Sequence, residues 1–185
     1  MSRIPQLNPA DMDADQKRIH DALTNGPHGH VVGPFPAWLH SPKLAEKARG
    51  VSAFIRFESS LPAHLREIAI LICGRYWRAE FEYWAHAAIA RKAGVEEAII
   101  KAIARGQRPD FQDGQAAVLY DFCTELFENR RVSDATYQRG IAALGLQQVV
   151  EMVATIGYYS MVSLTLNAFE VPLPEGAEPP FPEAG

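Results

Sequence analysis

Hydrophobic residues recur every three or four positions along most of this chain, and no segment alternates apolar and polar residues as a half-buried strand does. This pattern predicts an all-α protein. Gly- and Pro-rich stretches separate the periodic segments and mark the loops. The helices expected from the pattern cover residues 13–24, 42–58, 63–77, 79–93, 95–106, 114–129, 133–144 and 146–169.

Particular residues set the ends of several helices. Asp11 or Asp13 is available to cap the first helix, and Ser133 is placed to cap a later one. Ser41 followed by Pro42 has the chemistry of an N-cap and a first helical turn. Gly145 is expected to break the chain before the last helix. Residues 68–73 are apolar on every face, so their helix should be the central buried one.

Length and composition favour a single domain over residues 1–185, because 185 residues with 48% hydrophobic side chains form one well-buried core. Residues 1–40 are expected to be an N-terminal extension, with one helix and a Pro- and Gly-rich loop at 25–36. Residues 171–185 form a Pro-rich tail. A helix, turn and long buried helix occur around 41–94 and again around 114–169, which suggests a helical-hairpin duplication.

The net charge of −4 provides no general basic field for nucleic acid. The N-terminus has no apolar core of a secretory signal, and we count no apolar run near the roughly 20 residues that span a bilayer. We therefore expect a cytoplasmic protein that binds neither nucleic acid nor membrane. Cys73 and Cys123 lie in apolar helical surroundings and are interpreted as buried, inert thiols, with a redox pair as the alternative.

Acidic and imidazole side chains interrupt two apolar helix faces. Glu82 and His86 lie one turn apart, in the sector of their helix that also holds Ile89. Glu67 shares a stripe with small and apolar residues on the preceding helix. Two carboxylates beside a histidine can exchange protons near neutral pH, because each environment shifts the pKa of its group. The alternative is a buried Glu–His pair that only satisfies its own hydrogen bonds.

Two arginines precede the helix that carries Glu82 and His86. Arg75 and Arg78 are candidates to bind a substrate carboxylate, since guanidinium groups and helix N-termini both attract anions. In the alternative, Arg78 only pairs with Glu82 four residues on, and Arg75 is solvated.

The segment LPAHLREIAILICGRYWRAEFEYWAHAAIARKAGV, residues 61–95, resembles the carboxymuconolactone decarboxylase superfamily, which includes the AhpD-like alkylhydroperoxidases. The resemblance covers about residues 50–105 and implies an AhpD-like helical bundle. AhpD-like members carry a glutamate, a CxxC motif and then a histidine. These positions correspond here to Glu67, to Ala79 and Glu82 in place of the cysteines, and to His86. Peroxide reduction by that motif requires both thiols, so the resemblance implies that this activity is absent here.

The decarboxylase branch also lacks CxxC, and resemblance to it implies a lyase. The expected substrate is a small carboxylated lactone or keto acid from the breakdown of aromatic compounds. Glu82 and His86 would form the proton relay, Glu67 would tune it, and Arg75 or Arg78 would hold a carboxylate. Thiol peroxidase activity and non-catalytic binding of a small molecule are the alternatives.

We expect no cofactor and no metal at this site. A metal held by His64, Glu67, Glu82 and His86 is an alternative, because histidine and carboxylate ligands on facing helices can bind iron, manganese or zinc. The His28-Gly29-His30 segment is interpreted as a loop without ligand function. The run from Val149 to Phe169 is too apolar for a monomer surface, which predicts a homo-oligomer, either a dimer, a trimer or a hexamer.

Overall fold

The computed structural model describes residues 2–26 and 29–182. The described residues contain helices and loops and no strand, so the predicted all-α class is confirmed. In chain order the helices are α1 (Ala14–Thr24), α2 (Phe35–Trp38), α3 (Pro42–Ala53), the π-helical turn η1 (Phe54–Glu58), α4 (Ala63–Tyr76), α5 (Glu80–Lys92), α6 (Glu97–Ala104), α7 (Gly114–Asn129) and α8 (Asp134–Ala168).

Side-chain caps begin several of these helices. Asp13 accepts a hydrogen bond from the backbone N–H of Gln16, whose side chain bonds back to Asp13 in a reciprocal capping box. Ser133 caps α8 through the N–H of Thr136, as the sequence predicts. Ser41 occupies the N-cap position of α3, but its side chain makes no capping hydrogen bond. Pro42 alone marks that helix start.

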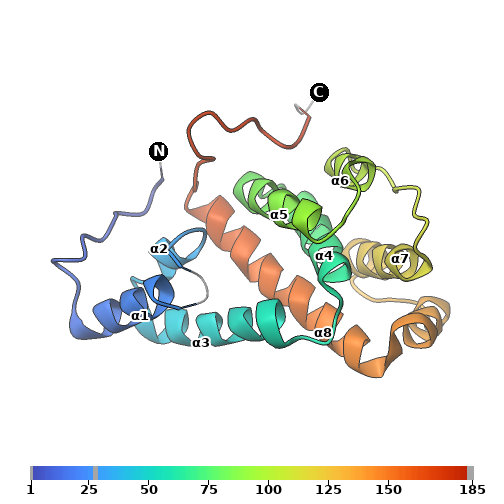
Figure 1. Ribbon diagram of the computed structural model, residues 1–185, viewed down its shortest axis with the longest axis horizontal. Coiled ribbons are helices and arrows are strands. Elements are labelled where there is room, and N and C mark those ends of the chain that lie inside the picture. The colour runs from blue at the N-terminus through green and yellow to red at the C-terminus, as the bar shows by residue number, and fades with distance from the viewer. Residues whose placement is uncertain (1, 27–28, 183–185) are drawn as a thin grey trace.

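Helix α8 consists of two helical segments that meet at Gly145. The φ of Gly145 is 79° and its ψ is 162°, a backbone conformation outside the helical region that glycine adopts without a Cβ clash. Figure 1 shows the sharp bend in the orange part of α8. The predicted break at Gly145 is therefore confirmed. The proposed hairpin duplication and the single-domain assignment stay predictions.

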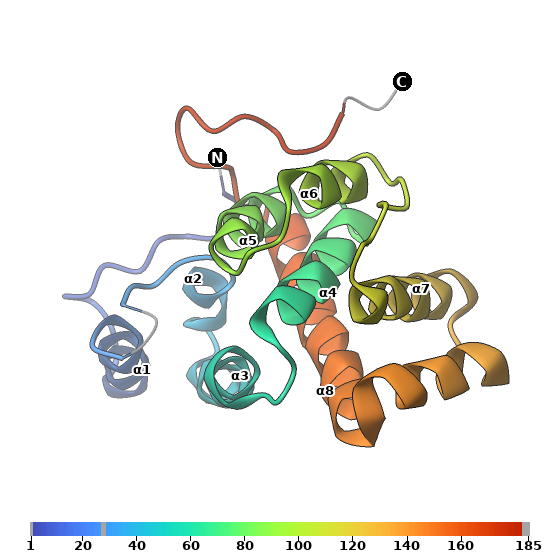
Figure 2. The same ribbon diagram turned by 45° about the vertical axis from the view of Figure 1, so that its right-hand side comes forward.

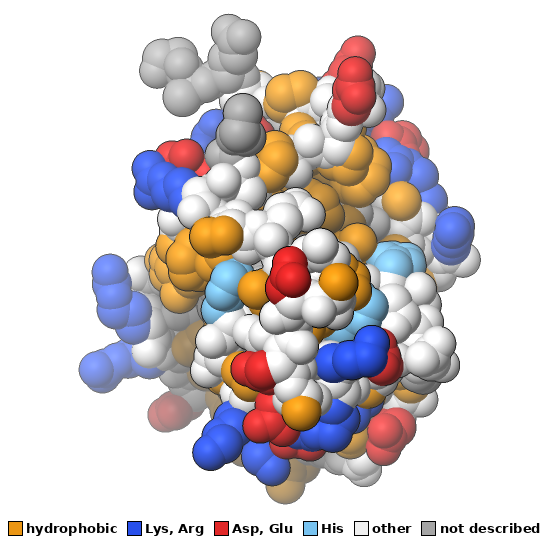
Figure 3. Space-filling view, turned by 90° about the vertical axis from the view of Figure 1, so that its left-hand side faces the viewer, with side chains coloured by type: hydrophobic (Ala, Val, Ile, Leu, Met, Phe, Trp, Pro, Cys, Tyr) orange, Lys and Arg blue, Asp and Glu red, His pale blue; other side chains and the backbone are white. Residues whose placement is uncertain are grey.

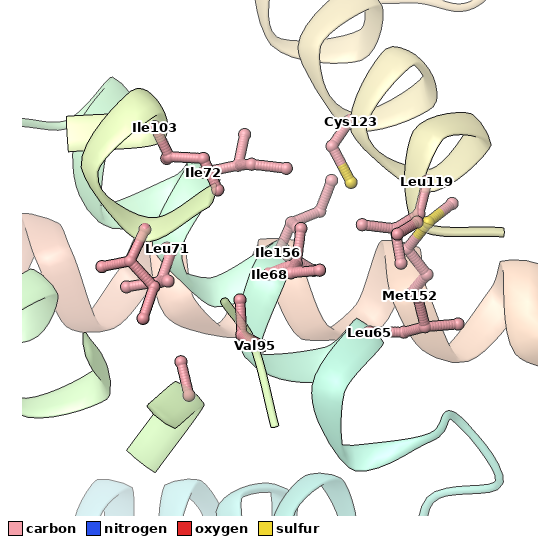
Figure 4. Packing of buried hydrophobic residues seen from close by; sticks show 14 of the residues in the cluster. Leu65, Ile68, Leu71, Ile72, Val95, Ile103, Leu119, Cys123, Met152 and Ile156 are labelled. Atoms are coloured by element: carbon pink, nitrogen blue, oxygen red, sulfur yellow. The ribbon is translucent and has the colours of Figure 1, made fainter. Parts of the chain in front are cut away.

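Helix α4 is the central helix of the larger hydrophobic cluster. It contacts α5, α6, α7 and α8, and α5 to α7 lie together on one side of α8 in Figures 1 and 2. Leu65, Ile68 and Leu71 of α4 are at most 1% exposed. Figure 4 shows these side chains among residues of α6, α7 and α8. Burial on every face explains why residues 68–73 are uniformly apolar.

Helices α1, α2 and α3 form the other side of the molecule and cover a second cluster of buried residues. The short helix α2 was not predicted from the sequence, where residues 25–36 read as a loop. Trp38 of α2 is 5% exposed and donates a hydrogen bond from its indole nitrogen to Thr165 of α8. Tertiary contact with α8 thus stabilises a helix too short to form alone.

By length and composition alone α8 could cross a membrane, whereas no run of that kind was expected from the sequence. Its most apolar window has a mean hydropathy of 1.4, but 56% of that window is buried inside the protein. Burial of this kind suits the core helix of a bundle.

Figure 3 shows acidic and basic side chains interspersed on the face that carries α1, with no large area of a single charge there.

A buried carboxylate on α8 holds the loop between η1 and α4. Glu151 is 8% exposed and accepts hydrogen bonds from the Ser59 hydroxyl at 2.6 Å, the Ser60 N–H at 2.6 Å and the Gln147 amide at 2.9 Å. Burial favours a higher pKa, but these donors outweigh it and lower the pKa of Glu151 to about 2.

We expect Glu151→Gln to destabilise the protein by about 1–2 kcal/mol at neutral pH, because the charge-assisted hydrogen bonds weaken. A carboxylate with a lowered pKa stabilises the fold above its ordinary pKa, near 4.5, and this contribution disappears as the pH falls toward 2. Urea unfolding between pH 7 and pH 2.5 should show the variant losing less stability than the wild type. Glu58→Gln, at an exposed position, is the control. Parallel pH profiles for wild type and Glu151→Gln would contradict this role.

Candidate functional site

The structure brings Glu67, Glu82 and His86 together. Glu67 lies on α4, and Glu82 and His86 lie one turn apart on α5. Nδ1 of His86 is 2.7 Å from Oε2 of Glu67, and Nε2 of His86 is 3.0 Å from Oε1 of Glu82. Glu67, Glu82 and His86 are 2%, 4% and 7% exposed. The imidazole therefore lies between two buried carboxylates.

The two carboxylates differ in how they meet the ring. Glu67 makes the aligned hydrogen bond with Nδ1, and its other oxygen is 3.5 Å from Nε of Arg66. Oε1 of Glu82 is buried and has no aligned hydrogen-bond donor among the described residues, despite its short distance from Nε2. Glu67 thus fixes the ring, as the acidic residue of a catalytic triad does, and Glu82 retains unused acceptor capacity.

The two carboxylates also set the protonation of His86. Burial alone would lower the pKa of the imidazole, but the negative charges of Glu82 and Glu67 outweigh burial and raise the pKa of His86 to about 9. At neutral pH the ring is therefore an imidazolium with a proton on each nitrogen, which makes it a proton donor.

A cavity of about 180 Å³ opens beside this cluster. Glu82, His86 and Ile89 of α5 line one wall, which is the helix sector that the sequence pattern indicates. Glu67 does not line the cavity and lies behind the His86 ring. The site thus has an acid–base pair facing the cavity and a supporting carboxylate behind it.

Other residues of the cavity lining were not predicted as site residues from the sequence: Ser52, Arg56, Tyr158 and Tyr159, with His30 from the loop before α2. The Tyr159 ring meets the His86 ring edge to face at a centroid distance of 4.9 Å, and burial raises the pKa of Tyr159 well above its usual value. A hydroxyl pair from Ser52 and Tyr158 lies nearby, and burial raises the pKa of Tyr158 to about 12. Two adjacent tyrosines within an apolar helical run are the signal that could have found this wall.

The structure places Arg75 and Arg78 away from this cavity, which differs from the expectation that they hold a substrate carboxylate beside His86. Both guanidinium groups lie over the ring of Phe181 in the C-terminal tail, at 5.5 Å and 5.7 Å from its centroid. Arg75 lines a separate cavity of about 250 Å³ together with Gly106. Arg78 has a φ of 51° at the corner between α4 and α5 and lines another cavity, of about 270 Å³, with Glu80.

The metal alternative loses one of its proposed ligands. His64 pairs with Asp113 at 3.1 Å, and its side chain is 39% exposed. Within residues 2–26 and 29–182, no group of three or more histidine, cysteine, aspartate and glutamate side chains is arranged to hold a metal ion. His28 lies outside the described residues.

The cysteines are buried in hydrophobic surroundings. Burial raises the pKa of Cys73 to about 12 and raises that of Cys123 as well. The Cys123 sulfur points into aliphatic side chains in Figure 4. Ala79, at one of the CxxC positions, is fully buried at the N-cap of α5. Neither sulfur lies among the residues lining the His86 cavity.

No protein-family model and no curated protein matches this chain. Among solved structures, it is similar to the alkylhydroperoxidase AhpD core of an uncharacterized peroxidase-related protein from Ralstonia eutropha JMP134. The TM-score is 0.78 at 14% identity, over 94% of this chain and 93% of that one. The chain has the AhpD-like fold.

A second solved structure agrees with this assignment. It is an uncharacterized peroxidase-related protein from Silicibacter sp. TM1040, with a TM-score of 0.76 and 13% identity over 91% of this chain and 90% of that one. The resemblance inferred from residues 61–95 is thus confirmed at the level of the fold. At such low identity the fold is shared, and function has to be argued from the site of this chain.

Proposed function

We propose that this protein is a carbon–carbon lyase that removes CO2 from a small carboxylated lactone or keto acid, such as those formed when aromatic compounds are degraded. The observation that carries the proposal is the buried Glu67–His86–Glu82 cluster at the edge of a cavity. One carboxylate holds Nδ1 of the imidazolium, Nε2 contacts a second carboxylate, and both His86 and Glu82 line the cavity, an arrangement suited to general acid catalysis.

The reaction needs one proton and an acceptor for one electron pair. The bond between the substrate carbon and its carboxylate breaks, CO2 leaves, and the electron pair moves into the adjacent carbonyl of the substrate as an enolate. His86 then donates its Nε2 proton to the carbon, directly or through Glu82, and water restores the proton. Glu67 keeps the ring oriented throughout. Because the carbonyl of the substrate accepts the electron pair, these reaction steps use no thiol.

Two alternatives make different demands on the site. A thiol peroxidase would need an accessible thiolate, whereas both cysteines are buried and have raised pKa values. A non-catalytic binding protein would need the cavity but would have no use for an imidazolium between two carboxylates.

One screen separates these functions. Purified protein is incubated in D2O with a panel of lactone carboxylates and β-keto acids, and CO2 release and deuterium at the product carbon are measured together. We expect both signals with at least one compound, and no peroxidase turnover with tert-butyl hydroperoxide and dithiothreitol. Binding without CO2 release across the panel would favour the non-catalytic alternative. Peroxidase activity that is lost in Cys73→Ser would overturn the proposal.

We also propose that the protein self-associates through an exposed apolar stripe on α8. Leu146, Val150, Val153 and Leu164 are 61%, 58%, 41% and 48% exposed. The first three are spaced four and three residues apart, as in the seam of a coiled coil, and Leu164 continues the same register. A stripe of this kind on a second copy would cover the first.

We expect Val150→Glu to weaken this association by about tenfold or more, because each copy would bury an unpaired charge. Light scattering after size exclusion measures the change in mass. Gln138→Glu, at an exposed position on the first segment of α8, adds the same charge outside the stripe and should leave the mass unchanged. A wild-type protein that is monomeric at micromolar concentration would contradict self-association through α8.

A further inference from the structure

One positive charge in the His86 cavity has no carboxylate partner among the described residues. Arg56 lines the cavity, and its guanidinium lies 5.5 Å from the ring centroid of its neighbour Phe57. The ion pairs of the cluster join Glu67 to Arg66 and to His86, and Glu82 to His86; none of them includes Arg56.

The backbone at Arg56 is itself irregular. Arg56 lies in the π-helical turn η1, directly after α3. A π-helical turn takes in an extra residue and so alters the direction of the side chains it carries, and such turns occur frequently at functional sites. Arg56 follows Ser52 by four residues, and both line the cavity. The irregular turn is thus part of the cavity wall.

The guanidinium acts on the same wall as the tyrosines. Burial raises the pKa values of Tyr158 and Tyr159, and the positive charge of Arg56 offsets a small part of that rise. Arg56 and the two tyrosines line the same cavity as Glu82 and His86, so an anion held by Arg56 would lie close to the tyrosine rings. The cavity of about 180 Å³ is smaller than the roughly 300–1,000 Å³ typical of sites for drug-sized ligands, so one small acid can contact both walls.

The charges of the cluster compensate one another except for this arginine. The two acidic side chains have two cationic neighbours, His86 and Arg66. Arg56 can therefore compensate one negative charge on a bound ligand. A second negative charge on the ligand would face Glu82, whose buried Oε1 already has no aligned donor.

We infer that Arg56 binds the carboxylate that the substrate keeps, and that the cavity compensates this one negative charge and leaves the departing carboxylate uncompensated beside Glu82. The ligand class is a small organic acid that loses one carboxylate as CO2 and retains another. The part concerning the departing carboxylate rests on the proposed decarboxylation. Loss of CO2 there relieves a like-charge contact, so the site favours the monoanion that remains.

Three probes of nearly constant shape test the charge preference: dimethyl succinate, monomethyl succinate and succinate carry none, one and two negative charges. Ligand-observed NMR titrations at pH 7 measure their affinities. With the wild type we expect monomethyl succinate to bind about tenfold or more tightly than either of the others. Succinate binding as tightly as monomethyl succinate, or no binding by any probe, would overturn the inference.

Variants of Arg56 test its role. Arg56→Met should weaken monomethyl succinate binding about tenfold or more and leave dimethyl succinate unaffected, because only the charge is removed. Arg56→Lys should restore part of the affinity, which shows that the effect is not a folding defect. Arg105→Met, at an exposed position at the end of α6 and outside the lining of the His86 cavity, is the matched control and should bind all probes like the wild type. Unchanged affinity for monomethyl succinate in Arg56→Met would refute the role of Arg56.

The same variants separate this inference from the proposed function. CO2 release that depends on His86 but is insensitive to Arg56→Met would refute the role of Arg56 and leave the lyase intact. Arg56-dependent binding of monomethyl succinate, with no CO2 release from any substrate, would refute the lyase and leave Arg56 as the anion-binding residue.

Discussion

Replacing His86 with glutamine is expected to lower the rate of CO2 release by about 10²–10⁴-fold, the usual contribution of a positioned general acid. The imidazolium has a proton to donate at neutral pH, since the pKa of His86 is raised to about 9. Glutamine retains a hydrogen-bonding amide but cannot transfer a proton. The measurement is steady-state turnover of wild type and His86→Gln on the best substrate of the screen. Binding of the same compound is measured separately.

A matched substitution controls for the loss of a histidine in general. His64→Gln removes an imidazole that pairs with Asp113 outside the cavity, and turnover should stay at the wild-type level. Circular dichroism of both variants establishes that the helices remain. If His86→Gln keeps more than about a tenth of the wild-type turnover, proton donation by His86 is not the source of the rate.

The second large expected effect is a change in the free energy of unfolding with pH. The pKa of His86 is about 9 in the folded protein and near 6.5 in an unfolded chain. A raised pKa means that the folded state binds the proton more tightly, so this contribution is complete below pH 6.5 and disappears as the pH rises through 9. Its size is on the order of 3 kcal/mol. We expect the free energy of unfolding, measured in urea, to fall over this interval.

Glu67→Gln tests the origin of this pH dependence. Glutamine keeps the shape and an acceptor oxygen toward Nδ1, but it removes one of the two negative charges that raise the pKa of His86. The pKa of His86, followed by NMR, should move down toward its ordinary value, and the decline in stability should end at lower pH and be smaller. Glu58→Gln, at an exposed position, should leave both unchanged. A pKa of His86 that stays near 9 in Glu67→Gln would contradict the coupling.

Much of the helical structure could be predicted because its signals are local. Residues 114–129 were predicted as a helix and form α7, and Ser133 caps α8 through a residue three positions away. The break at Gly145 also depends on one residue and its backbone freedom. Helix α2 was missed because its four residues gain their stability from contact with α8, far away in the sequence.

In the candidate site too, some residues could be predicted from local spacing and others depend on tertiary contacts. Glu82 and His86 share a helix face through their spacing of four, and their burial follows from their apolar neighbours on that face. Arg75 and Arg78 were expected beside them because they precede the same helix in the chain. Both guanidinium groups instead lie over the ring of Phe181 in the C-terminal tail.

The sequence by itself determined the helices other than α2, the seclusion of three ionisable groups and the absence of cysteine at the two CxxC positions. Only the tertiary structure decided which nitrogen of His86 meets which carboxylate and which arginine enters the cavity. Helix formation and burial depend on residues within a turn or two of each other. The contacts between Arg56, the tyrosines and the α5 cluster depend on how helices about 30 to 100 residues apart pack together, and no local pattern records that arrangement.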